Sequence, residues 1–207
     1  MMKYLKSCQL CHANDKKDRV SIGKRVIYQG NYNYIAVDIS PLSLGHLLII
    51  TNEHYFNYYE TPKNVKKEAN QLKRKIEKVF REVYHSDTLF FEHGSSKPNE
   101  AGSSVDHAHL HAIPCSLYLE EELDVLGKPI ECDIFLEQFF NEFSYIYLEN
   151  SKNKYIYKVT KLPSQYLRKL VGEKLGNAHY DWRVYCKTEY SLQILEQTYL
   201  DLKEKIK

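Results

Sequence analysis

The chain has 207 residues, 43% of them hydrophobic, so it can bury one sizeable core but is too short for two large independent domains. Its 29 basic and 27 acidic residues leave a formal net charge of +2. This balance excludes a long-range field that would select a nucleic-acid backbone or an anionic membrane. We expect no nucleic-acid partner, and any binding of phosphate has to be local.

The beginning of the chain, MMKYLKSCQL, lacks the apolar run of a signal peptide, and nowhere do about 18 uncharged apolar residues follow one another. We therefore expect a cytoplasmic protein without a membrane partner. Five cysteines, an odd and scattered set, suit reduced thiols better than a disulfide framework.

Cys8 and Cys11 form a CxxC pair, a spacing that lets two thiolates bind one metal ion. A complete tetrahedral site needs two more ligands. Because the chain has no second CxxC, these ligands would have to be histidines from elsewhere. The spacing alone leaves open the alternative of two reduced thiols without a metal.

Three short β-branched and aromatic runs come next, at residues 25–29, 34–39 and 46–51. The first two are separated by Gly30 and predict a hairpin, and the third predicts a further strand. Single histidines such as His46 and His54 carry little information by themselves and are most often ordinary residues at a strand end.

Residues 63–83 predict an amphipathic helix, because apolar residues recur at intervals of three and four between charged ones. Thr61 is a candidate cap, and Pro62 stands where a helix can begin. We expect the charge-rich face to meet water, since acidic residues interleave with the basic ones.

Residues 87–94 predict another strand, and a polar loop with Gly and Pro follows it. Backbone amides of this loop, together with Ser103 and Ser104, could donate to phosphate oxygens without a large net charge. Serines beside a glycine are also usual in turns, and for Ser103 this plainer explanation is preferred.

Residues 103–114, SSVDHAHLHAIP, place His107, His109 and His111 at every second position. On a β-strand all three imidazoles would project from one face, about 6.5 to 7 Å apart. At that spacing the outer rings could hold oxygens of a group that the middle ring attacks. A row of buried imidazoles without function would need several hydrogen-bond partners, so the pattern favours chemistry.

The C-terminal part carries weaker signals. The patterns predict a helical or buried segment at 133–143, a strand pair at 144–149 and 155–160, a helix that Pro163 opens and Gly176 ends, and a last helix from Glu189. Between the two helices lies the only tryptophan, Trp182, beside Arg183. A core anchor is the ordinary explanation for Trp182, and a contact to substrate is the alternative.

Two blocks of the chain resemble the histidine triad (HIT) superfamily. HAHLHAI at 107–113 fits the signature of three histidines between apolar residues, and DISPLSLGHLLIITNEH at 38–54 is similar to the upstream strand pair. With the CxxC the likeness covers roughly residues 5–118. It implies an α+β, HIT-like fold with a five-stranded antiparallel sheet and packed helices over 1–118. Residues 119–207 would be a helical and strand extension packed on the same core.

The resemblance also implies a nucleotide-binding hydrolase, usually a homodimer, that cleaves the bond between an α-phosphate and its leaving group. A nucleoside phosphoramidate or a dinucleoside polyphosphate would be its substrate. The residues carried over have separate roles: His109 attacks phosphorus, His111 donates to a phosphate oxygen, His46 supports the triad, Ser103 and Ser104 lie at the phosphate, Asp38 accepts the ribose hydroxyls, and Ile39 contacts the base. Neutral imidazole is largely unprotonated at pH 7 and needs no strong base to attack.

In zinc-bearing members, the first triad histidine and the histidine that closes the upstream block join the two cysteines. This implies a zinc site of Cys8, Cys11, His54 and His107. Such a zinc is structural, because four protein ligands leave no open position for water. The chain departs from the usual upstream block at Thr51 and Asn52, where proline and lysine are often found.

Three alternatives stay open. A nucleotidyltransferase or phosphorylase of the same superfamily is one, although a histidine at 111, where the transferase branches have glutamine, favours hydrolysis. The second is a metal-dependent hydrolase that uses the histidine cluster. The third is a non-catalytic nucleotide-binding adaptor whose partners dock on the C-terminal segment.

Overall fold

A computed structural model of the chain describes residues 8–11, 25–98, 100–136 and 143–207. Within these ranges one antiparallel sheet of eight strands has the order β1-β2-β3-β5-β4-β7-β8-β6. The strands are β1 (Val26–Gln29), β2 (Asn33–Val37), β3 (Leu47–Thr51), β4 (Thr88–Gly94), β5 (His109–Pro114), β6 (Ile130–Glu131), β7 (Ser144–Glu149) and β8 (Lys154–Val159).

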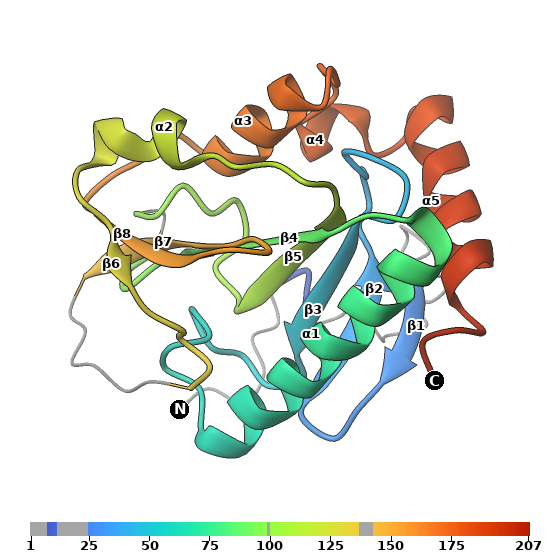
Figure 1. The fold of residues 1–207 in the computed structure, drawn as a ribbon, viewed down its shortest axis with the longest axis horizontal. Coiled ribbons are helices and arrows are strands. Elements are labelled where there is room, and N and C mark those ends of the chain that lie inside the picture. The colour runs from blue at the N-terminus through green and yellow to red at the C-terminus, as the bar shows by residue number, and fades with distance from the viewer. Residues whose placement is uncertain (1–7, 12–24, 99, 137–142) are drawn as a thin grey trace.

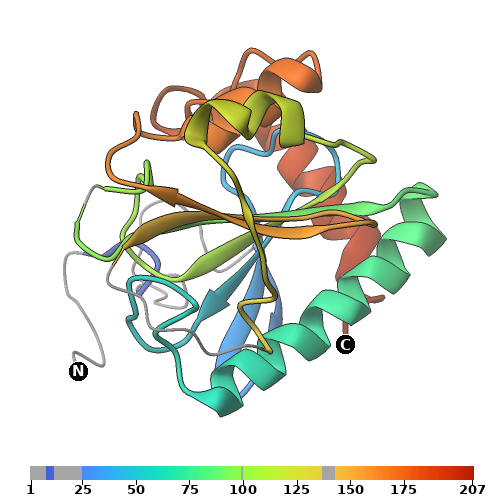
Figure 2. The ribbon, with the colours of Figure 1, turned by 60° about the vertical axis from the view of Figure 1, so that its left-hand side comes forward.

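Helices cover both faces of the sheet (Figures 1 and 2). Helix α1 crosses one face, while α2, α3 and α4 lie over the other, and α5 packs with α1 against the core at the β1–β2 side. The helices are α1 (Lys63–Tyr84), α2 (Glu120–Leu123), a 3-10 turn η2 (Asp124–Leu126), α3 (Tyr166–Lys174), α4 (Trp182–Tyr185) and α5 (Glu189–Leu202).

The fold is α+β as predicted, but the described sheet has eight strands and the expected number of five is wrong. The five strands of the predicted part, β1 to β5, lie next to one another, and β7, β8 and β6 extend the sheet beyond β4. A strand pair was predicted at 144–149 and 155–160, and the structure has it at 144–149 and 154–159. The local pattern could not indicate that β7 would pair with β4, because the residues of one strand do not specify its partner.

Helix α1 follows from its sequence, since its apolar residues at three-four spacing are buried against the sheet. The prediction that Thr61 caps it is wrong. Pro62 is the N-cap residue, without a side-chain cap, and the Thr61 hydroxyl instead donates to the carbonyl of Tyr58, 2.7 Å away. The helix ends at His85, which has a left-handed conformation with φ 52°.

The two faces of β5 point into different parts of the molecule. Leu110 and Ala112 pack into the core under α1, whereas Ile113 packs into the core that includes α3. Because side chains alternate along a strand, His109 and His111 share the face of Ile113 and point toward the C-terminal helices.

Two glycines with positive φ shape the turns that lead into this region. Gly45, at φ +84°, precedes His46, and a Cβ there would come within 2.6 Å of Pro114 and Tyr84. Gly102, at φ +75°, precedes the two serines, and its carbonyl accepts the backbone N–H of Gln165 at 2.7 Å. Only glycine adopts such conformations without strain, so both turns depend on it.

No helix in the described ranges combines the length and the apolar character that are needed to cross a membrane.

Candidate active site

His109 is the first residue of β5 and His111 the third, but His107 lies before the strand. The prediction that all three imidazoles share one strand face is therefore wrong for His107. The reason is local: the backbone N–H of Ala108 donates to the carbonyl of Tyr55, outside the sheet ladder, and the His107 ring turns toward the cysteines. The carbonyl of His107 instead accepts the Nδ1–H of His109 at 2.5 Å.

That hydrogen bond fixes the tautomer of His109. A neutral imidazole with its proton on Nδ1 carries a lone pair on Nε2. Burial lowers the pKa of His109, and the carbonyl of His107 opposes this shift by accepting the Nδ1–H. His109 also lines a cavity, so an unprotonated ring nitrogen is available there at neutral pH.

His46 and His111 form a hydrogen-bonded pair beside His109. The backbone N–H of Leu42 donates to His46 Nδ1 at 3.1 Å, so the proton of the neutral His46 ring is on Nε2. His46 Nε2 lies 2.9 Å from His111 Nδ1 and donates to it. The proton of the neutral His111 ring is then on Nε2, the position from which it can donate to a ligand.

Burial keeps these rings neutral. It lowers the pKa of His46 to about 4 and the pKa of His111 well below its ordinary value, where the neighbouring histidines and Arg168 lower it further. The His111 ring also stacks on Phe91, with ring centroids 4.3 Å apart and an interplanar angle of 11°. The His111 ring, whose Nε2–H can donate to a ligand, is therefore held in one orientation.

Arg168 enters this site from α3, and sequence reasoning missed it. Its guanidinium donates to Asp38 Oδ2 at 2.9 Å, to the carbonyl of Ser40 at 2.7 Å and to the carbonyl of Tyr180 at 3.0 Å. Although burial opposes ionisation of Asp38, the charge of Arg168 holds the pKa of the Asp38 carboxyl below its usual value. The buried ion pair joins the C-terminal extension to the loop after β2.

Asp38, His46 and His111 bring three possible ligand atoms within 4.8 Å of one another, but their contacts disfavour a metal there. The 2.9 Å between the two ring nitrogens is a hydrogen-bond distance, whereas two nitrogens on one zinc ion lie about 3.3 Å apart. Arg168 already supplies the positive charge beside the carboxylate.

The cavity at His109 is small, with a volume of about 70 Å³, and an adjoining hollow of about 270 Å³ shares Ser104 and Trp182 with it. Asp38, Ile39, Ser104, His109, His111, Arg168 and Trp182 are among the residues that line the smaller cavity. Ser103 does not line it, because its hydroxyl donates to the carbonyl of Val105 at 2.7 Å.

Trp182 closes the cavity from the extension. Its Nε1–H donates to the Ser104 hydroxyl at 2.6 Å, and Arg183 donates to the Ser104 carbonyl at 3.3 Å. Of the two explanations for this tryptophan, the structure therefore supports a place at the site over a core anchor.

Cys8, Cys11, His54 and His107 form a second cluster, with all four possible ligand atoms within 4.8 Å of one another. The Cys8 and Cys11 sulfurs lie 3.4 and 3.5 Å from His107 Nδ1, and Cys11 lies 3.4 Å from His54 Nδ1. Sulfur and nitrogen atoms bound to one tetrahedral zinc are about 3.3 to 3.8 Å apart, so the donor set fits this metal.

Contacts outside the cluster also fit a metal. His107 Nε2 lies 2.9 Å from the carbonyl and 3.0 Å from the hydroxyl of Thr51, which leaves the Nδ1 lone pair facing the cysteines. Burial raises the pKa of Cys8 to about 11, so a thiolate there at neutral pH needs a cation beside it.

The ion pair of Asp38 and Arg168 gives a first prediction. Arg168→Met should lower the free energy of unfolding by about 3–5 kcal/mol, because it leaves the Asp38 carboxylate buried without a cation. Urea unfolding checks this, with Lys169→Met as control, since Lys169 pairs with Glu173 at the surface. If the losses of unfolding free energy in Asp38→Asn and Arg168→Met simply add in the double variant, the ion pair is not the cause of the lost stability.

Comparisons with known proteins agree with the earlier resemblance. Residues 19–116 match the family described as HIT domain. A Bacillus subtilis protein named Protein hit is 28% identical over 88 residues, covering 42% of this chain and 59% of that protein, which is less than two thirds of its length. An uncharacterised HIT-like protein of Methanocaldococcus jannaschii is 28% identical over 101 residues, covering 45% of this chain and 70% of that protein. A solved zinc-bound histidine triad family protein from Mycobacterium smegmatis aligns with a TM-score of 0.43 at 24% identity, covering 53% of this chain and 75% of that one.

Proposed function

Since this chain belongs to the HIT superfamily through the domain at residues 19–116, we propose that it is a nucleotide-binding hydrolase. It cleaves the bond between a nucleotide's α-phosphate and its leaving group through a nucleotidyl-histidine intermediate. The substrate is a nucleoside phosphoramidate or a dinucleoside polyphosphate. The observation that carries this proposal is the hydrogen bond from His109 Nδ1 to the carbonyl of His107, which leaves His109 Nε2 unprotonated at a cavity.

In the first step, His109 Nε2 attacks the α-phosphorus. A P–N bond to the ring forms while the bond to the leaving group breaks, and the leaving group departs with its electron pair and takes up a proton. The ring gains positive charge as it is nucleotidylated, and the His107 carbonyl accepting Nδ1–H stabilises that charge. In the second step, water attacks the same phosphorus, and the P–N bond breaks to release the nucleoside monophosphate.

His111 and His46 act on the phosphate. The Nε2–H of His111 donates to a non-bridging phosphate oxygen, and His46 keeps the proton there by donating to His111 Nδ1. Ser104 lies at the same cavity, and because its oxygen accepts from Trp182, its own O–H is free to donate to the phosphate or to the leaving group.

Asp38 and Ile39 serve the nucleoside. One oxygen of Asp38 accepts the N–H of Ser40 and the other accepts from Arg168. Because a carboxylate has about four lone-pair sites, it can still accept from the ribose hydroxyls. Ile39 lines the cavity and offers apolar area to the base.

The cysteine and histidine cluster holds a structural zinc ion in this proposal. Cys8, Cys11, His54 and His107 supply four protein ligands, which leaves no position for a reacting water. When bound, the ion ties the N-terminal CxxC to the loop after β3 and to the residue before β5.

A substrate panel in water enriched in ¹⁸O tests the function. We expect release of a nucleoside monophosphate with one ¹⁸O on its phosphate from at least one phosphoramidate or dinucleoside polyphosphate, measured by mass spectrometry. Formation of a nucleoside diphosphate only when inorganic phosphate is present would indicate a phosphorylase. Nucleotide binding without any product would favour the adaptor and contradict the hydrolase.

A further inference from the structure

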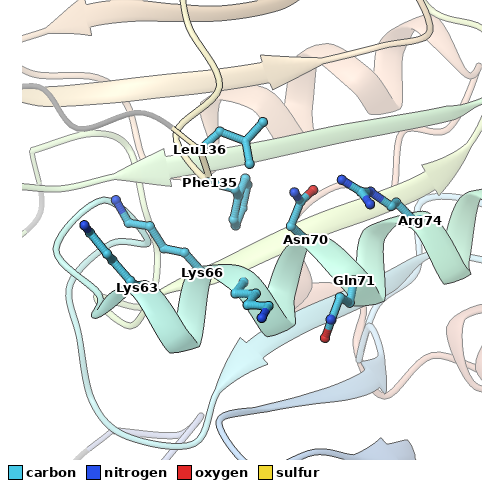
Figure 3. Close-up of a pocket in the computed structure, with 8 residues that line it drawn as sticks. Lys63, Lys66, Asn70, Gln71, Arg74, Phe135 and Leu136 are labelled. Carbon is cyan, nitrogen blue, oxygen red and sulfur yellow. The ribbon is translucent and has the colours of Figure 1, made fainter.

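A second hollow lies on the opposite face of the sheet, between the first half of α1 and the segment before residue 137, and Figure 3 shows it. Its volume of about 480 Å³ falls within the range of small-molecule sites, roughly 300–1,000 Å³. The lining residues are Lys63, Lys66, Lys67, Asn70, Gln71, Arg74, Phe135 and Leu136. None of them lines the cavity at His109.

Cations and an amide form a row along one side of this groove. Lys63, Lys66, Asn70 and Arg74 are spaced by three, four and four residues, so they share one face of α1, and Figure 3 shows them on the side of Phe135 and Leu136. The row spans about 16 Å of helix.

Lys66 is the central observation. It is 6% exposed, and in the described ranges its ammonium has no hydrogen-bond or ion-pair partner, only the ring of Tyr59 at 4.6 Å from the centroid. An ammonium on a side chain this deeply packed has lost much of its hydration, and burial lowers its pKa although Glu92 opposes this shift. An anion in the groove would give this ammonium a partner.

The acidic residues that interleave with these cations in the sequence do not neutralise them. Glu68 accepts the backbone N–H groups of residues 31–33, and Glu82 pairs with Lys78 further along α1. Glu92, the acid that acts on Lys66, accepts from Tyr58 and Tyr145, and burial raises its pKa to about 8, which favours its neutral form at pH 7. Among the described residues, the four cations of the groove have no ion pair.

The start of α1 adds positive potential. Its first turn contains no acidic residue and its N-cap has no side-chain hydrogen bond, so the free N–H groups and the positive end of the helix dipole lie beside Lys63 and Lys66. Lysines at this end of a helix repel the dipole. A bound anion would give Lys66 a partner and would also interact favourably with the positive end of the helix dipole.

We propose that this groove binds a compact anion with two or more phosphate groups. Phosphate oxygens accept from Lys66 and from the amide of Asn70 next to it, and Lys63, Lys67 and Arg74 add positive charge around the ligand. The bounded volume of the groove selects a small ligand over a nucleic-acid strand. The site is independent of the hydrolase proposed above, because the two share no residue.

Isothermal titration of the full chain with tripolyphosphate tests the groove. We expect Lys63→Gln/Arg74→Gln to weaken binding at least about tenfold, while Lys75→Gln/Lys78→Gln, which removes the same charge from the same helix outside the groove, leaves it unchanged. Lys66→Met should abolish the binding without lowering the melting temperature, because it removes a cation that has no ion-pair partner in the described ranges and keeps the side-chain length.

Three results would contradict the proposal that the groove binds a phosphate-rich anion. One is equal weakening in the control pair, which would indicate unspecific attraction to a basic helix. Another is binding that persists in both groove variants but is lost in His111→Ala, which would place the anion at the triad alone. The third is a single-stranded oligonucleotide that binds a hundredfold more tightly than tripolyphosphate through the same lysines. Failure of the hydrolase assay would leave this titration unaffected.

Discussion

Replacing His109 with alanine is expected to lower turnover by at least about 10³-fold while nucleotide affinity changes little. The alanine removes the ring nitrogen that forms the P–N bond, and no other described nitrogen has the same position. His111 Nδ1 is engaged by His46, and the neutral His111 ring carries its proton on Nε2. The variant should therefore lack the covalent step but keep the contacts of Asp38, Ile39 and Ser104.

Two measurements separate chemistry from binding. Steady-state release of the monophosphate gives the loss in kcat, and titration with adenosine 5′-monophosphate gives the affinity of the pocket. His85→Asn is a matched control, since it removes an exposed histidine at a left-handed position that asparagine tolerates. Mass spectrometry of acid-quenched wild-type protein should show a nucleotidyl adduct that the His109 variant lacks. Full activity of His109→Ala would end the proposed mechanism.

The sequence predicted the elements of this fold better than their partners. Runs of β-branched and aromatic residues located β2, β4 and β7, and a three-four pattern located α1, because each of these signals depends on the residues of a single element. The partner of β4 in the extension depends on tertiary packing, which no local pattern encodes. The same limit explains the wrong number of strands.

The histidine pattern was right about chemistry and partly wrong about geometry. Period two assumes a regular strand, and this assumption fails at His107, where the backbone pairs outside the ladder. The resemblance to the HIT superfamily was the better guide here, since it implied that His107 lies with Cys8, Cys11 and His54 at a zinc site. A histidine that binds with Cys8 and Cys11 cannot also face the pocket of His109.

The sequence assigned no role to Arg168. It lies in an amphipathic segment where an exposed arginine is ordinary, and its partner Asp38 is 130 positions away. Trp182 was noticed as the single tryptophan, yet only the fold brings it to Ser104. The extension therefore supplies residues to the site, and these two contacts support our proposal that residues 119–207 pack on the same core as residues 1–118.

Loss of the metal is expected to be the largest change in stability. The four ligands of the cluster come from three segments, and Cys11 and His107 are 96 positions apart in the sequence, so a bound ion ties the N-terminal CxxC to the loop after β3 and to the segment before β5. We expect one zinc per chain by elemental analysis. Cys8→Ser should lose this zinc and several kcal/mol of unfolding free energy, because a hydroxyl does not replace a thiolate as a zinc ligand.

Cys186→Ser provides the control, since this half-buried cysteine of the extension belongs to no cluster of possible ligands in the described residues. It should keep the zinc and the melting temperature of the wild type. A strong chelator should lower the melting temperature of the wild type and leave that of Cys8→Ser unchanged, because only the wild type has an ion to lose. If the chelator removes zinc and the melting temperature stays the same, the ion is not structural. In that case the hydrogen bonds from His107 to Thr51 would be sufficient to hold the residue that positions His109.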